Sequence, residues 1–542
     1  MQYVRDPVHG DVALTEEEYE VLETVEMQRL NRLRQLHLVY LVYPGATHSR
    51  LAHSIGVLHA TRRVIKESNL PYSREKERLL GLAALLHDVA HSCFAHVLEP
   101  SFTAEFMPLH EDVTQFVLDG RIQDYWSKFS SANPRELESV RFVADVLDQD
   151  TRSEVGAILS NKRPGLSELV SGIVDADNLD YIRRDSAFLG FPSASYDDAI
   201  YSGFMLEERD GTDRLVVRDN QIILSAVEDV IKGRWYLFRH AYLHHAVMAA
   251  NAMLIDAVRL TLKGDAFPAL YVLGDDELLH ALAHGDSLWV KSDSDALRGR
   301  ELASRLAHRQ LYKRCFSINV TGPKAQRHYD AFRRSPPEAG RFLNTLREAT
   351  GRNALIGYPI VPPAKDYLRL PVEGHKFLDE GLKEAALERY GERYRQLEVL
   401  YVYIDTENWK IREQVNKICQ QEFKDAGEYD LHQEESRSER TLVELESAVE
   451  RLMNQRRAAV RVLEVLLSGE ELTTAQICVK TSLSAGTVSL YLKSLGEAFR
   501  LSRAHVVRRH PSQTGGVGKR AQLWSIPDKR HRDLLSKVIA NA

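Results

Sequence analysis

The sequence predicts a mainly α-helical protein with several domains. The chain has 542 residues, which is too long for one ordinary domain. Apolar residues recur at helical spacing through most of the first half. Residues 397–405 (LEVLYVYID), by contrast, have the β-branched and aromatic content of a buried strand. We therefore expect a helical domain at 1–320, a mixed α/β accessory region at 321–421, an acidic linker or connecting helix at 422–452 and a basic domain at 453–542.

Helical periodicity and turn residues define the elements of the first domain. Pro44 and Gly45, in the stretch YPGATHSR, separate two helices. The apolar run LLGLAALL belongs to a third helix and must be almost entirely buried. The expected helices are 15–40, 51–69, 75–98, 102–120, 136–148, 165–185 and 222–262, and the expected short strands are 11–14 and 214–224.

Residues 422–450 differ in composition from what precedes them. They include ten acidic residues against three basic ones, and few aromatics. We interpret them as a flexible segment that passes into a connecting helix. An ordinary solvated helix of the preceding domain is the alternative.

The C-terminal unit has the element order of a winged helix-turn-helix. Three amphipathic stretches, RRAAVRVLEVLLSG, TTAQICVKTSL and SAGTVSLYLKSLGEAF, are followed by two strand-like pieces around a Gly-rich loop. Between 498 and 532 there are nine Lys and Arg residues against one acid, Asp528. A basic wing suits contact with nucleic-acid phosphates, although winged helices also dock proteins. We favour DNA or RNA as the partner, and the candidate contacts are Lys493, Arg503, Arg508, Arg509, Lys519 and Arg520.

Composition argues against a membrane-spanning or exported protein and leaves nucleic-acid binding open. The content of 44% hydrophobic and 27% charged residues is that of a globular protein with a sizeable core. The net charge of −6 does not decide for or against nucleic acid, because a local basic patch can exist within an acidic total. No apolar run is long enough to span a membrane, and the first residues do not form a signal segment. The four cysteines are far apart and form no CxxC pair, so we expect a cytoplasmic protein without a disulfide framework.

A candidate metal site begins at His87 and Asp88. They follow the buried run LLGLAALL, where an ionised Asp would be costly without compensation. A divalent cation suits adjacent imidazole and carboxylate groups. His53, 34 residues upstream, and Asp177, 89 residues downstream, would complete four ligands and leave open positions for water and a phosphate oxygen. Helix caps and hydrogen-bonded core histidines are the alternative interpretation of the same residues.

Four stretches carry a resemblance to a known family. RDPVHGDVAL, YPGATHSRLAHSIGVLHA, LLHDVAHSCFAHVLE and DADNLDYIRRD occur in this order and at similar spacing in the HD-domain deoxynucleoside triphosphate triphosphohydrolases. This family includes a member with an added sterile alpha motif. The resemblance covers roughly residues 1 to 320 and implies the helical HD bundle. It also implies that His53, His87, Asp88 and Asp177 bind a divalent metal ion (Mn, Mg, Fe, Ni or Zn).

The resemblance implies further site residues. Spacing alone places His91 and His96 near the HD pair, with Glu99 one turn beyond His96, as for a base oriented by an acid. The family match assigns His96 and Glu99 to proton transfer and turns His91 and His110 towards the phosphates. The implied substrate-binding residues are Gln35, Leu36, Arg50, Asn178, Tyr181, Asp185, Arg234 and Tyr242. Asn178 stands where the family has a phosphate-binding lysine, so one positive charge is lost.

Three functions are compatible with these residues. The first is hydrolysis of dNTPs to deoxynucleoside and triphosphate, by water attack at the α-phosphorus. The second keeps the metal site but acts on DNA ends or single strands, as a nuclease or phosphodiesterase. The third is a DNA-binding regulator that uses the HD domain as a ligand sensor. We favour the first, and we expect a homo-oligomer because related enzymes assemble.

Overall fold

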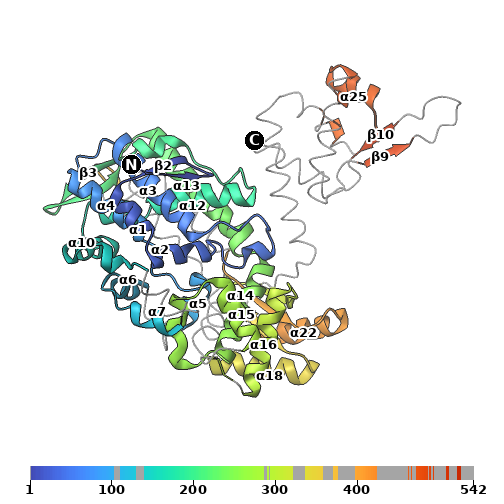
Figure 1. Ribbon diagram of the computed structural model, residues 1–542. Helices are drawn as coiled ribbons and strands as arrows, with labels where there is room; N and C mark the ends of the chain where they lie inside the picture. The colour runs from blue at the N-terminus through green and yellow to red at the C-terminus, as the bar shows by residue number, and fades with distance from the viewer. Residues whose placement is uncertain are drawn as a thin grey trace. The chain divides into compact units, whose positions relative to one another are not determined.

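The computed structural model divides the chain into two compact units, Met1–Tyr429 and Asp430–Ala542 (Figure 1). Each unit is described by itself. The accessory region predicted at 321–421 lies in the first unit. The structure describes residues 2–102, 110–129, 140–285, 290–291, 293–320, 336–357, 370–375, 397–423, 462, 465–466, 472–485, 488–489, 492, 508–511 and 522–525.

The first unit is mainly α-helical, as predicted. Its central helices pack against one another in the order α4, α3, α12 and α13 (Figure 1). Polar side chains cap them: Ser49 and Ser73 accept hydrogen bonds from the first turns of α3 and α4. The central helices are α3 (Arg50–Glu67), α4 (Arg74–Leu86), α12 (Ala176–Leu189) and α13 (Gln221–Leu237).

Smaller elements surround these helices. Strands β1 (Gln2–Asp6) and β2 (Gly10–Leu14) form one antiparallel hairpin, and β3 (Phe204–Arg209) and β4 (Thr212–Val217) form another. Between residues 110 and 307, the other described helical elements are α6 (His110–Leu118), α7 (Gln123–Phe129), α9 (Val143–Val146), α10 (Gln149–Leu159), α11 (Ser167–Val170), η3 (Asp198–Ser202), the π-helical turn η4 (Phe238–Tyr242), α14 (His245–Thr261), η5 (Gly264–Tyr271), α15 (Asp275–His284) and α16 (Ser294–Ala307).

The helix predicted at 15–40 is wrong as a single element. Thr15 caps α1 (Glu16–Leu22), and a new short helix α2 (Val25–Arg29) follows Thr24. After the 3₁₀ turn η1 (Leu30–Arg32), residues 33–38 leave the helical conformation because they bond to another segment, and a second 3₁₀ turn, η2 (Val39–Leu41), follows. Arg34 pairs with Ser49 in an antiparallel bridge, and Gln35 N donates to His48 O. These bonds bring the 34–37 segment beside the start of α3.

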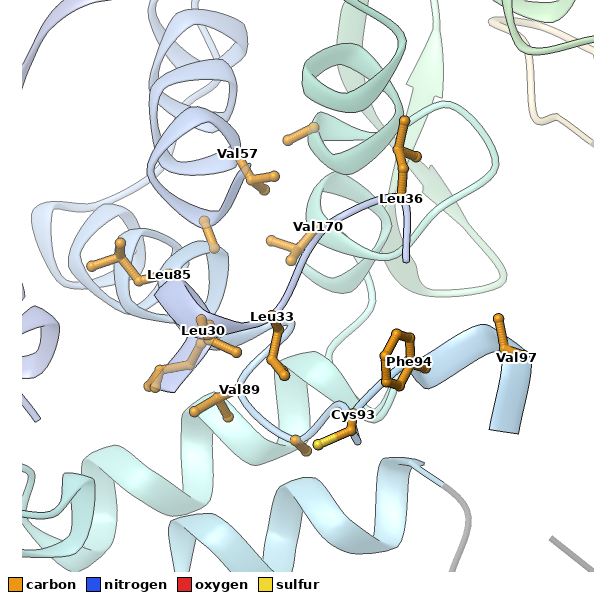
Figure 2. Packing of buried hydrophobic residues seen from close by; sticks show 14 of the residues in the cluster. Leu30, Leu33, Leu36, Val57, Leu85, Val89, Cys93, Phe94, Val97 and Val170 are labelled. Atoms are coloured by element: carbon orange, nitrogen blue, oxygen red, sulfur yellow. The ribbon is translucent and has the colours of Figure 1, made fainter. Parts of the chain in front are cut away.

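The helix predicted at 75–98 is also interrupted. Helix α4 ends at Leu86, and α5 (Ala95–Phe102) begins after eight intervening residues. Between them the backbone turns, and Phe94 adopts a left-handed φ of 49°. Figure 2 shows Val89, Cys93 and Phe94 directed into the apolar core beside Leu33. Periodicity missed the break because the connection is as apolar as the helices that flank it.

Other predicted elements are shifted or shortened. In the described part of the range 136–148, residues 140–148, the helix is α9, and 165–185 is divided between α11 and α12. The strand predicted at 214–224 ends at Val217, because Asn220 caps α13 and the apolar residues after it are helical. The range 222–262 is two helices separated by η4.

The accessory region contains its own small sheet. Strand β7 (Val399–Ile404) confirms the strand predicted at 397–405 and lies between β5 (Lys313–Asn319) and β6 (Ala354–Gly357), all antiparallel. Helices α18 (Pro336–Thr350) and α22 (Trp409–Glu422) pack against it. Phe316, Val402 and Phe423 belong to the second apolar core that results.

The second unit is described only in part. Thr473 caps α25 (Thr474–Thr481), which is the second of the three predicted helices. Strands β8 (Leu472–Thr473), β10 (Gln522–Ser525) and β9 (Arg508–Pro511) form an antiparallel sheet in that order. Most of the predicted recognition helix lies outside the described residues, so the winged helix-turn-helix stays a prediction. Among the described helices of the whole chain, none combines the length and the apolar character needed to cross a membrane.

Candidate active site

Three side chains from different helices meet at the candidate metal site. His53 comes from α3, His87 follows the last residue of α4, and Asp177 lies in the first turn of α12. One ligand atom from each lies within 4.8 Å of the others. His53 Nε2 is 3.2 Å from His87 Nε2 and 2.9 Å from Asp177 Oδ1. These three predicted ligands therefore converge on one point.

The donor chemistry of this cluster fits a cation. His53 Nδ1 faces Asp180 Oδ2 at 2.7 Å and His87 Nδ1 faces the Ala84 carbonyl oxygen at 2.9 Å, so both Nδ1 atoms carry hydrogen. In neutral rings both Nε2 atoms then present lone pairs, which point at each other and at the carboxylate of Asp177. Three converging lone pairs repel unless a proton or a metal ion lies between them. Adjacent ligand atoms of an octahedral ion about 2.1 Å away are ~3 Å apart, close to the spacings found here.

Asp88 lies at the edge of the cluster and connects it to Arg50. Its Oδ1 is 3.4 Å from His87 Nε2, and its Oδ2 is 4.0 Å from His53 Nε2. The same Oδ2 accepts a 2.6 Å hydrogen bond from Arg50 Nη1. Burial raises the pKa of Asp88, but the charges of His87 and Arg50 outweigh burial and lower it well below its usual value. Asp88 is therefore ionised and available as a fourth ligand.

Carboxylates set the protonation of His53. Burial lowers the pKa of His53, but its hydrogen bonds to Asp177 and Asp180 outweigh burial and raise the pKa to about 10. A proton therefore occupies the ring when no other cation is present. A metal ion at the same point would displace that proton.

A buried ionic network supports His53 from behind. Asp180 accepts hydrogen bonds from His53, from His9 Nε2 at 2.6 Å, and from Arg184 Nε at 2.8 Å. Arg184 also donates to Asp6 at 2.8 Å. These supporting residues, Asp6, His9, Asp180 and Arg184, were not among those predicted from the sequence. The quoted stretches RDPVHGDVAL and DADNLDYIRRD contain them, and Asp180 lies three residues after Asp177, near the same face of α12.

Arg50 is almost completely buried, and two of its donors are unused. The side chain is 1% exposed, and its Nη1 is committed to Asp88. Within the described residues, Nε and Nη2 have no hydrogen-bond partner. Buried guanidinium groups are normally fully hydrogen-bonded, so the two free donors fit a missing anionic ligand.

Glu99 bonds to His91 rather than to His96. His91 Nε2 is 3.1 Å from Asp88 Oδ1, and His91 Nδ1 is 3.2 Å from Glu99 Oε1. Burial and the charge of Arg50 lower the pKa of His91, but these two carboxylates outweigh them and raise it. Through these two contacts His91 links Asp88 to Glu99, and both carboxylates favour its charged form.

His96 presents an exposed ring beside this pair. It lies edge-on to His91, with ring centroids 4.8 Å apart. Its desolvation within the crowded site and the charge of His91 lower the pKa of His96 to about 3, so the ring is neutral at pH 7. His91, His96 and Glu99 also lie close enough together to bind a metal ion.

A second polar group surrounds Asp185 on α12. His48 Nε2 lies 2.7 Å from Asp185 Oδ1, and the Tyr242 hydroxyl donates to Asp185 Oδ2. His48 was not assigned from the sequence, although it belongs to the quoted stretch YPGATHSR. The predicted substrate-binding residues Asp185 and Tyr242 are therefore in contact. Gln35 has a buried side-chain oxygen without a partner among the described residues, and Leu36 is 7% exposed.

Asp175 and Asn178 fix the start of α12. Asp175 accepts from Gly172 N, Asn178 N and the Asn178 side-chain amide. Burial and the nearby charge of Asp177 raise the pKa of Asp175 to about 7. One N–H of the Asn178 amide donates to Asp175, and its carbonyl oxygen is buried without a partner among the described residues, so Asn178 offers a ligand an uncharged amide in place of a cation.

A cavity of about 610 Å³ touches the metal cluster at one residue, Asp177. Its wall also includes Asn178, Arg214 and Arg234. Known small-molecule sites have volumes of about 300 to 1,000 Å³, so the cavity is large enough for a nucleotide. Tyr181 is half-buried on α12.

Several predicted contacts cannot be placed. His110 begins α6, but its side chain is outside the part that the structure describes. Arg508 and Arg509 lie on β9, where only the backbone is described. The remaining predicted nucleic-acid contacts, Lys493, Arg503, Lys519 and Arg520, lie outside the described residues.

A known protein family matches the part of the chain that holds this cluster. The family model described as "HD domain" matches residues 50–182, which include the four predicted metal ligands. The chain contains an HD domain. Its fold is that expected from the four sequence stretches.

Several curated proteins are similar in sequence to this chain. The uncharacterized protein YwfO of Bacillus subtilis is 30% identical over 254 residues, 46% of this chain and 53% of that protein. The uncharacterized protein MJ1154 of Methanocaldococcus jannaschii is 30% identical over 259 residues, 48% of this chain and 49% of that protein. The deoxynucleoside triphosphate triphosphohydrolase SAMHD1 of Homo sapiens is 24% identical over 368 residues, 59% of this chain and 56% of that protein. The chain thus spans about half the length of the curated relatives it matches.

A solved structure shares the fold beyond the HD domain. The crystal structure of a hypothetical protein from Aquifex aeolicus aligns with a TM-score of 0.52 at 22% sequence identity. The alignment covers 77% of this chain and 99% of the Aquifex chain. At this identity the likeness concerns the fold alone.

Proposed function

We propose that the chain is a metal-dependent HD phosphohydrolase that converts dNTPs to deoxynucleoside and triphosphate. The observation that carries the proposal is the arrangement around Asp88. Three converging lone-pair donors lie close to this carboxylate, and Arg50, with two unused buried donors, is hydrogen-bonded to it. A phosphate group bound beside Asp88 would contact both the metal ion of the cluster and the free donors of Arg50. The resemblance to SAMHD1, a deoxynucleoside triphosphate triphosphohydrolase, supports the nucleotide as substrate.

His53, His87, Asp88 and Asp177 would hold a divalent cation, which would supply Lewis acidity beside the scissile phosphorus. Arg50 would bind oxygens of the phosphate chain through Nε and Nη2. Arg234, on the wall of the adjoining cavity, would bind the phosphates farther along. Asp185, held between His48 and Tyr242, would accept a hydrogen bond from the sugar hydroxyl.

His96 is the group best placed to move protons. The reaction forms a bond from water oxygen to the α-phosphorus and breaks the bond from that phosphorus to the 5′ oxygen. One water proton must leave, and the departing 5′ oxygen must gain one. His96 is neutral, exposed and not held by a carboxylate hydrogen bond among the described residues. Bound triphosphate would add negative charge near the ring and raise the pKa of His96 towards neutrality.

The cavity favours a free nucleotide over a nucleic-acid strand, because it adjoins Asp177 and has the volume of a small-molecule site. The experiment is to incubate the protein with Mn²⁺ or Mg²⁺ and, separately, each dNTP, each rNTP and labelled single- and double-stranded DNA. Deoxynucleoside and tripolyphosphate are expected. Shortened DNA with intact dNTPs would instead make the protein a nuclease.

Two variants test whether hydrolysis takes place at this site. Asp177→Ala should abolish hydrolysis. Asp11→Ala, which removes a carboxylate from an exposed pair with Arg5, should leave it unchanged. Equal activity of the two variants would show that the assigned site is not the active one.

We also propose that the C-terminal unit binds nucleic acid. The support is the excess of basic residues between 498 and 532, in a predicted wing.

A further inference from the structure

His37 occupies a backbone conformation that histidine adopts at a cost. Its φ is +48°, in the left-handed region where a β-carbon crowds the backbone and glycine is preferred. The hydrogen bond from its N–H to Arg34 O, and the pairing of Arg34 and Gln35 with the residues before α3, hold this turn in place. The turn itself therefore favours glycine at position 37, whereas the chain has an imidazole there.

The ring of His37 is buried without hydrogen bonds. The residue is 9% exposed, and neither Nδ1 nor Nε2 has a partner within the described residues. A neutral imidazole always carries one donor and one acceptor, and buried polar groups of this kind are normally satisfied. Two unmet groups on one ring indicate that a ligand supplies at least one partner.

The surroundings of His37 identify the class of ligand. Its ring lies edge-on to that of His96, with centroids 5.7 Å apart. Arg50, whose Nε and Nη2 are also without partners, acts electrostatically on it, as does His91. Unused donors from His37 and Arg50 thus lie in one region of the site. An oxyanion with several acceptor oxygens, such as a phosphate, satisfies donors of both kinds.

We propose that His37 is a substrate-binding residue that donates a ring N–H to an oxygen of the phosphate chain held by Arg50. The inference rests on the proposed phosphohydrolase function and adds a residue to it. His37 would hold the phosphate chain in position without transferring a proton. The hydrogen bond would offset the energetic cost of the left-handed backbone only when the ligand is bound.

The test compares His37→Gly with His37→Asn and with a control. Glycine suits the left-handed backbone but removes the ring, whereas asparagine tolerates this backbone and retains an N–H donor. The control is Asp210→Gly, at φ +52° in the exposed β3–β4 turn, where glycine also replaces a left-handed residue. For each variant, calorimetry measures the Kd for inorganic tripolyphosphate with Mg²⁺ present, kinetics measure KM and kcat for a dNTP, and thermal denaturation measures Tm.

We expect His37→Gly to weaken tripolyphosphate binding and raise KM by about tenfold, as for loss of one hydrogen bond to a charged group, with a smaller change in kcat. Its Tm should be equal to or above that of the wild type. His37→Asn should recover part of the affinity, and Asp210→Gly should bind as the wild type does.

Different results would overturn different claims. An unchanged Kd in His37→Gly, or a wild type that does not bind tripolyphosphate, contradicts the role of His37, as does a fall in Tm with unchanged affinity. Should His37→Gly fail to fold, an unchanged Kd together with an unchanged KM in His37→Phe would contradict the role equally. A wild type that binds tripolyphosphate through His37 but hydrolyses no nucleotide would contradict the proposed function alone.

Discussion

At the scale of single residues, Asp180 holds His53 in position. It is fully buried and accepts hydrogen bonds from His53, His9 and Arg184. Such a carboxylate fixes the ring of a metal-binding histidine and the nitrogen that carries hydrogen. Burial raises the pKa of Asp180, but Arg184 and the two histidines outweigh burial and lower it well below its usual value.

Replacing Asp180 with Asn should therefore affect both stability and metal binding. Among the described residues, loss of the charge leaves Arg184 with only Asp6 as an ionic partner, and breaking a buried pair costs about 3–5 kcal/mol. Metal affinity should fall by about 10- to 100-fold. Chemical denaturation and metal titration measure the two effects. Wild-type metal affinity in a destabilised variant would show that Asp180 serves the fold only.

The buried carboxyl group of Glu26, which is not one of the proposed site residues, should make the stability of the fold depend on pH. Burial raises the pKa of Glu26 to about 8, although Val143 N donates to its carboxyl group. In the unfolded chain the pKa is near 4.5. The stabilising contribution of the protonated carboxyl is therefore complete below about pH 4.5 and is lost as pH rises through about 8. Glu26→Gln should raise Tm relative to the wild type more at pH 8.5 than at pH 5.5. A difference that does not change with pH would contradict the shifted pKa.

The sequence identifies the candidate metal ligands, but it does not identify the residues that hold these ligands in position. His53, His87 and Asp177 lie in motifs whose spacing and resemblance single them out, and the structure brings them together. The hydrogen bond between Asp180 and His53 joins residues 127 positions apart, and the one between Asp180 and His9 joins residues 171 positions apart. No local pattern reports contacts of that separation. The unpaired nitrogens of His37 likewise become visible only in three dimensions.

At the scale of elements, the break between α4 and α5 is the feature that creates the site. The apolar pattern from 75 to 98 predicts one helix, because Val89, Cys93 and Phe94 are as buried as the residues of α4. In the structure the chain turns after Leu86, which lets His87, Asp88 and His91 face the cluster from a compact turn. Hydrophobic periodicity reports burial and cannot distinguish a buried turn from a buried helix.

The cap at the N-terminus of α12 should affect both the stability of the fold and hydrolysis. Asp175 caps this helix and holds Asn178, next to the ligand Asp177. Asp175→Ala should lower the free energy of unfolding by about 1 kcal/mol and also reduce hydrolysis, because Asp177 loses its fixed position. Asp148 caps α10, which carries none of the proposed site residues, so Asp148→Ala should reduce stability but leave hydrolysis unchanged. Full activity of Asp175→Ala would show that the cap does not position Asp177.

At the scale of the whole molecule, hydrolysis and nucleic-acid binding are assigned to different compact units. Changing Lys519 and Arg520 together to Glu should weaken binding to duplex DNA, and the decline of affinity with salt should become shallower by about two in log–log slope. Nucleotide hydrolysis should be unaffected. Fluorescence anisotropy at several salt concentrations measures the first effect, and wild-type binding by the double variant would place the nucleic-acid surface elsewhere.

The central claim is that water attacks the α-phosphorus of a dNTP at the HD site. The most direct test is hydrolysis in ¹⁸O-labelled water with a divalent metal, followed by mass spectrometry of both products. The proposed function predicts unlabelled deoxynucleoside and tripolyphosphate with one ¹⁸O on a terminal phosphorus. Deoxynucleoside monophosphate with pyrophosphate, or label in the deoxynucleoside, would contradict it.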